Sequence, residues 1–194
     1  AVFGNFVNRS LVLTHKYFEG KVPAMVNLNE KDQTAIEEMN QYPDKIAHLL
    51  DTYKFREALS ELMNLARLGN RYLTENEPWK QFKTDPERVK TVLAVSLQIV
   101  AKLAILSEPF LPFSAKKLQA MIGLEVSGWN QAKKTVLLNE DSVIGEVELL
   151  FTKIEDETVA AQVKKLEDTK AQNELNAWAP KPIKPETNID EFGK

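Results

Sequence analysis

Cysteine is absent from the 194 residues, so disulfide bonds, thiolate nucleophiles and Cys-ligated zinc sites are all excluded. The two histidines, His15 and His48, do not have the close spacing of a helical metal site, and we predict no metal site in this chain. Glycine and proline are also scarce, with seven and nine residues. This scarcity favours long helices over many short strands joined by tight turns.

The sequence patterns of common catalytic sites are missing as well. We find no glycine-rich phosphate loop, no Gly-x-Ser-x-Gly turn and no pair of carboxylates with an evident partner. A signal peptide is not visible, and the longest apolar run is interrupted by Lys102. We therefore expect a cytoplasmic protein without a membrane contact, whose role is recognition and not catalysis.

The formal net charge of −3 argues against a protein that coats nucleic acid with its whole surface. A local basic patch is still compatible with this charge. The candidates to line a path for phosphate groups are Lys16, Arg71, Lys80 and Lys83. The alternative is that these side chains are only solvated, as most exposed charges on helices are.

The spacing of apolar residues predicts an all-α protein, a bundle of about five main helices followed by an irregular C-terminal segment. The predicted helices cover about 2–19, 29–50 with strain at Pro43, 52–76, 85–108 and 114–121. The fourth of these carries apolar residues on more than one face, so we expect it to be the central buried helix. Because no N-cap residue precedes the first helix, we expect the chain to be part of a longer protein.

We divide the chain into three parts. Residues 1–134 are the helical bundle. Residues 135–175 contain extended or loop segments to about Ile154 and then a polar helix at about 155–170. Residues 176–194 contain three prolines among lysines and glutamates and are predicted to be a linker.

The pair Pro78-Trp79 is the least ordinary local feature of the bundle. Proline lacks a backbone N–H and disfavours the α conformation at the residue before it, so the third helix is predicted to end before Pro78 and a new turn to begin near it. Trp79 then lies on a corner. An aromatic side chain at a corner is either a plug for a small core or a platform on which a flat group stacks, and both readings stay open here.

Three motifs, in the order in which they follow one another along the chain, resemble the anticodon-binding domain of bacterial methionyl-tRNA synthetases. They are Asn5-x-x-x-Arg9, FREAL at 55–59 and NRYLTENEPWK at 70–80, and the resemblance extends over roughly 1–155. It implies the helical anticodon-binding domain of a class I synthetase. The implied function is recognition of the CAU anticodon of methionine tRNA.

The same resemblance assigns roles to individual residues. Asn5 and Arg9 match family residues that hydrogen-bond the first anticodon base, and Trp79 matches the one that stacks on it. Supporting roles fall to Asn70, Tyr72 and Pro78, with Tyr72 expected to pack against or bond the loop that holds Trp79. Asn5 and Arg9 are four residues apart and project from one side of a helix, where an amide and a guanidinium can share one base edge.

For the parent protein, the resemblance implies a methionine–tRNA ligase whose partner is tRNA. ATP and Mg, with Zn as a further candidate, are the implied cofactors of its catalytic domain, and this chain is expected to bind none. Residues 135–175 are implied to pack toward that domain. The linker is implied to lead to an OB-fold domain through which the parent forms a homodimer, whereas this chain alone is expected to be a monomer.

Two alternatives remain for the chain itself. One is the anticodon-binding bundle of another class I synthetase. The other is a helical protein-interaction module, in which an apolar groove near Trp79 binds a partner helix.

Overall fold

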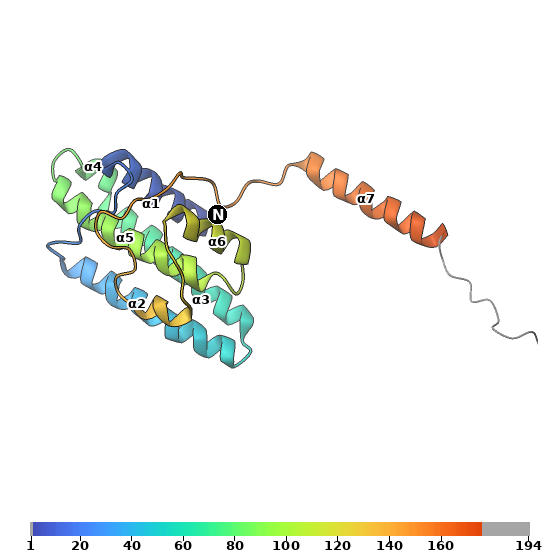
Figure 1. Ribbon diagram of the computed structural model, residues 1–194, viewed down its shortest axis with the longest axis horizontal. Helices are drawn as coiled ribbons and strands as arrows, with labels where there is room; N and C mark the ends of the chain where they lie inside the picture. Colours follow the sequence, from blue (N-terminus) through green and yellow to red (C-terminus); the bar gives the residue numbers. More distant parts are fainter. Residues whose placement is uncertain (1, 176–194) are drawn as a thin grey trace, which may run out of the picture. The chain divides into compact units, whose positions relative to one another are not determined.

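The computed structural model describes residues 2–175 of the chain, and within this range its regular secondary structure is helical, which confirms the all-α class (Figure 1). The predicted linker at 176–194 lies outside the described residues. The chain divides into two compact units, Ala1–Phe151 and Thr152–Lys194. The elements are α1 (Val2–Phe18), α2 (Glu30–Asp51), α3 (Phe55–Asn76), α4 (Pro78–Gln81), α5 (Pro86–Leu106), α6 (Pro112–Met121), the 3-10 helix η1 (Trp129–Lys133) and α7 (Asp156–Leu175).

Helix α5 is the centre of the first unit and contacts α1, α2, α3, α4 and α6, as predicted for the central helix (Figure 1). It begins after Asp85, whose side chain accepts a hydrogen bond from the Arg88 amide, and Pro86 occupies the first turn. Every residue from Thr91 to Leu106 is buried. The helix has the length and hydropathy of a membrane-crossing helix, but 94% of that stretch is buried inside the protein. It is therefore a core helix.

Two buried polar side chains of α5 hold η1 and the irregular segment that follows it. The Gln98 amide nitrogen donates to the Leu138 carbonyl at 2.8 Å, and the Gln98 amide oxygen accepts from the Leu138 N–H at 3.1 Å. The Lys102 Nζ donates to the carbonyls of Ala132 and Lys134 at 2.6 and 2.8 Å. These bonds satisfy polar groups that would be costly to bury unpaired. They also attach the segment to the core.

Helices α1 and α3 approach each other closely at Gly69. A Cβ atom at Gly69 would lie 2.5 Å from the Phe6 ring carbons Cε1 and Cε2, closer than real Cβ atoms come to other atoms. Phe6 is fully buried, so its ring has no free space into which to move. Glycine at position 69 therefore sets the distance between the two helices.

The structure differs from the predicted elements after α6. Residues Trp129–Lys133 form η1, although the sequence predicts no helix after about residue 121 of the bundle. The Trp129 indole N–H donates to the Pro43 carbonyl at 3.2 Å, a contact between distant residues that local spacing cannot reveal. Helix α2, in contrast, continues through Pro43 as predicted, and Pro43 itself is buried.

The second unit contains α7, which extends the predicted polar helix to Leu175. Its side chains from 156 to 174 are exposed, and Lys170 and Glu174 form an i,i+4 ion pair with an N···O distance of 4.0 Å. Residues 135–151 belong to the first unit. The assignment of 135–175 as one part that faces a catalytic domain stays a prediction.

Replacing Gly69 with alanine is expected to lower the free energy of unfolding by about 1–3 kcal/mol, because the added methyl group overpacks the contact with Phe6. Alanine forms helices better than glycine does, so helix propensity alone would predict a higher free energy of unfolding. Urea unfolding measures it. The matched control is Ser60→Ala on the exposed face of α3, which is expected to leave stability unchanged or slightly higher. A Gly69→Ala variant as stable as the wild type would contradict the close approach.

Lys102 predicts a pH dependence of stability, because burial lowers its pKa from 10.5 to about 8. Between these pH values the unfolded chain binds more protons than the folded chain, so stability rises with pH. From pH 7.5 to 9.5 the free energy of unfolding of the wild type is expected to rise by about 2 kcal/mol relative to Lys102→Met. Urea unfolding of both proteins at each pH tests this. Parallel pH profiles would contradict it.

Candidate functional site

The corner at Pro78-Trp79 is present as predicted. Helix α3 ends at Asn76, and Glu77 is the C-cap of α3 and the N-cap of α4. Glu77 has a φ of 39°, in the left-handed region that residues other than glycine seldom adopt. Pro78 is the first residue of α4 and is buried, whereas Trp79 beside it is 37% exposed. The left-handed residue and the proline thus turn the chain sharply and leave the indole at the surface.

Arg9 of α1 lies against this indole. The Arg9 guanidinium carbon is 4.8 Å from the centroid of the Trp79 ring, within the range of a cation–π interaction. The structure therefore brings together two of the three residues predicted to read one base. The partial exposure of Trp79 favours the platform reading over the plug.

Asn5 lies on the exposed surface of α1, one turn before Arg9. Its amide nitrogen donates to the Asn70 Oδ1 of α3 at 3.3 Å. The Asn70 amide nitrogen donates to the carbonyls of Val2 and Ala66, each at 3.0 Å, which ties the start of α1 to α3. The predicted supporting residue Asn70 thus contacts Asn5 directly and orients its amide group.

We expected Tyr72 to pack against or bond the loop that holds Trp79, but its hydroxyl bonds a residue of α2. The Tyr72 ring is buried, and its hydroxyl donates to Asp32 Oδ1 of α2 at 2.5 Å. Burial and this hydrogen bond raise the pKa of the Tyr72 hydroxyl. Burial by itself would raise the pKa of the Asp32 carboxyl, but hydrogen bonds from Arg88 and Tyr72 outweigh it and hold that pKa below its ordinary value. Tyr72 therefore bonds the start of α2.

A further aromatic contact supports α4 and was not found from the sequence. The Phe82 ring stacks on Tyr17 of α1, with centroids 4.0 Å apart and planes 15° from parallel, and it meets Phe18 edge-on at 6.1 Å. Phe82 follows Trp79 by three residues, so the spacing alone placed both near one side of the turn. The pairing with Tyr17 depends on tertiary structure. Phe82 attaches α4 to the end of α1.

The basic residues proposed for a phosphate path differ in their partners. Lys80 forms an ion pair with Glu77 at 2.7 Å, and Arg71 forms one with Glu38 at 2.7 Å. A phosphate contact by either side chain therefore has to share the cation with a carboxylate. Lys16 is exposed and lies over the Tyr17 ring, with its Nζ 5.4 Å from the centroid.

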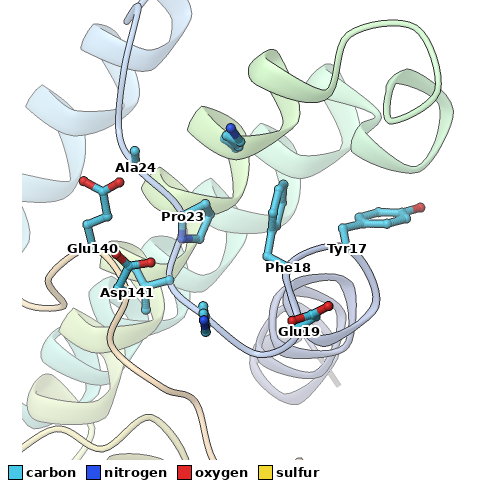
Figure 2. Close-up of a pocket in the computed structure, with 10 residues that line it drawn as sticks. Tyr17, Phe18, Glu19, Pro23, Ala24, Glu140 and Asp141 are labelled. Atoms are coloured by element: carbon cyan, nitrogen blue, oxygen red, sulfur yellow. The ribbon is translucent and has the colours of Figure 1, made fainter.

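A cleft of about 310 Å³ lies beside the end of α1 (Figure 2). Figure 2 shows Glu140 and Asp141 on one side of Pro23, and Phe18 and Glu19 on the other. The lysines Lys21 and Lys90 line the cleft as well, so its three carboxylates leave it without the excess of positive charge that attracts an RNA backbone. The exposed indole and its neighbours are the better candidate site.

The sequence matches the family described as the anticodon binding domain of methionyl tRNA ligase over residues 22–171. The chain belongs to this family. The match includes Trp79 and begins after α1, which carries Asn5 and Arg9.

Relatives that align with the whole of this chain cover α1 as well. The methionine–tRNA ligases of Cytophaga hutchinsonii and Phocaeicola vulgatus are each 52% identical to this chain over 194 residues, which is 100% of this chain and 28% of each relative. The chain therefore spans about 28% of the length of these curated relatives. A free-state structure of Mycobacterium tuberculosis methionyl-tRNA synthetase superimposes with a TM-score of 0.72 at 24% identity, covering 79% of this chain and 32% of that one. This likeness supports the fold.

We expect Arg9→Ala to lower the free energy of unfolding by about 0.5–1 kcal/mol, the worth of an exposed cation–π contact. It should also shift the indole N–H resonance of Trp79 in NMR spectra and leave that of Trp129 in place. The matched control is Lys16→Ala, which removes a cation over Tyr17 and should leave the Trp79 resonance unchanged. An unmoved Trp79 resonance in Arg9→Ala would show that the two side chains do not stack.

Proposed function

We propose that this chain binds the anticodon loop of methionine tRNA and recognises the first base of its CAU anticodon. The observation that supports this most directly is the contact between the Arg9 guanidinium and the exposed Trp79 indole. Proteins read single-stranded RNA loops by stacking the bases on aromatic or guanidinium planes and hydrogen-bonding their Watson–Crick edges. An indole, a guanidinium and the Asn5 amide supply these contacts in one place.

Each side chain has a distinct part in this proposal. Trp79 provides the flat surface for the base. Arg9 carries only donors, which suit the ring nitrogen and carbonyl oxygen of cytosine, and the Asn5 amide offers both a donor and an acceptor. Asn70 orients Asn5 through the hydrogen bond at 3.3 Å, and the buried Pro78 fixes the turn from which the indole projects.

The parent protein is, in this proposal, a bacterial cytoplasmic methionine–tRNA ligase that attaches methionine to tRNA with ATP. ATP and Mg, with Zn as a further candidate, belong to its catalytic domain, against which residues 135–175 would pack. No group of three or more His, Cys, Asp or Glu side chains that could hold a metal ion occurs in the described part of this chain. Dimerisation through a further OB-fold domain would be a property of the parent.

The test is a titration of the chain with two anticodon stem-loops, one carrying CAU and one with the first base changed. The wild type should prefer CAU. Trp79→Ala should lose about 1–3 kcal/mol of binding free energy with the fold intact, because a base–aromatic stack is worth that much. In Arg9→Ala the preference for CAU should shrink more than the overall affinity does.

Circular dichroism checks that both variants remain folded. Phe113→Ala is the matched control for loss of an exposed aromatic side chain, since Phe113 is 88% exposed at the start of α6. It should bind both loops as the wild type does. Equal affinity of the wild type for the two loops would refute the proposal. Binding that is insensitive to salt would instead favour an apolar protein-interaction groove.

A further inference from the structure

Four polar side chains meet where α2 begins, α3 ends and α5 begins. Asp32 lies in the first turn of α2, Tyr72 and Asn76 lie near the end of α3, and Arg88 lies in the first turn of α5. Asp32, Tyr72 and Asn76 are 0%, 3% and 5% exposed, and the Arg88 side chain is 15% exposed. Asn76 lies three residues before Trp79 in the sequence.

Arg88 joins three helix ends through one guanidinium group. Its Nη1 donates to Asp32 Oδ2 at 2.5 Å, and its Nη2 donates to Asp32 Oδ1 at 2.7 Å, which is a bidentate ion pair. The same Nη2 donates to Asn76 Oδ1 at 2.6 Å. The Asn76 amide nitrogen in turn donates to the Tyr72 carbonyl at 2.8 Å, within the last turn of α3.

Stability alone does not account for this arrangement, because a buried ion pair contributes little net stability compared with apolar side chains of similar size. Its distinct effect is to fix geometry. Helix α4 has only four residues, and so short a helix cannot hold its own orientation. The direction of the Trp79 indole therefore depends on what fixes the end of α3 before it, together with the contact of Phe82 with α1 after it.

We propose that Arg88 is a positioning residue for Trp79: by holding Asn76 it fixes the last turn of α3, and so sets how the indole faces Arg9 and an incoming base. The part of this proposal that concerns the base rests on the proposed function. The part that concerns the indole can be tested without RNA.

The decisive experiment is a double-mutant cycle between Arg88 and Trp79, read by affinity for the CAU stem-loop. Arg88→Met in the wild type is expected to weaken binding about tenfold, within the worth of a base–aromatic stack, and to reduce discrimination at the first base. In a Trp79→Ala background the same change should alter affinity by less than about twofold, because residues that act through one group are not additive. Equal losses in both backgrounds would overturn the proposal.

Two further variants separate positioning from loss of stability. Leu62→Ala removes a fully buried side chain in the first half of α3, so it should lower the melting temperature and keep full discrimination. Arg88→Lys keeps a positive charge beside Asp32 but lacks the fork that reaches both Asp32 and Asn76. It should fold and lose discrimination, which also covers the case in which Arg88→Met does not fold. Full discrimination in Arg88→Lys would overturn the proposal.

The indole N–H resonance of Trp79 in the free protein gives an independent answer. Arg88→Met and Arg88→Lys should shift or broaden it, and Leu62→Ala should leave it in place. If the wild type prefers neither stem-loop, the proposed function fails, and this resonance alone decides the positioning role. An unmoved resonance in both Arg88 variants would refute it.

Discussion

The burial of α5 on all sides is the constraint on which the rest of the structure depends. Because every residue from Thr91 to Leu106 is buried, the other helices of the first unit must be arranged around this one. A polar side chain on such a helix needs a partner. Gln98 and Lys102 bind backbone groups of η1 and of the segment after it, so the core helix also holds the irregular part of the chain in place.

In the candidate site, the side chains that would contact a base differ in burial from the side chains that support them. The side chains that would touch a base, Asn5, Arg9 and Trp79, lie at or near the surface, whereas their supports lie beneath them. Asn70 is half-buried between α1 and α3, and Pro78 is buried under the corner. The more buried supports thus restrict the surface side chains before RNA binds. This reduces the conformational entropy that these side chains would lose on binding.

Features that depend on neighbouring residues could be predicted from the sequence, whereas features that depend on contacts between distant residues could not. Pro78 acts on its own backbone and its neighbour, so the end of α3 and the corner were visible in the sequence. The central position of α5 was visible because its apolar residues occupy more than one face. The structure of η1 and the partner of Tyr72 could not be predicted from the sequence. Trp129 bonds Pro43 and Tyr72 bonds Asp32, and each partner lies far away in the sequence. The contact of Arg9 with Trp79 needed the resemblance to a family.

The carboxylate of Asp32 has a consequence for how the protein opens. One of its oxygens accepts from the Asn29 amide at 2.9 Å, which completes the capping box of α2, while both oxygens bind Arg88 of α5. If the first turn of α5 frays, a buried charge loses its partner and α2 loses part of its cap. We therefore expect the three helix ends to unfold locally as one cooperative unit, with amide hydrogens that exchange with solvent at a shared rate.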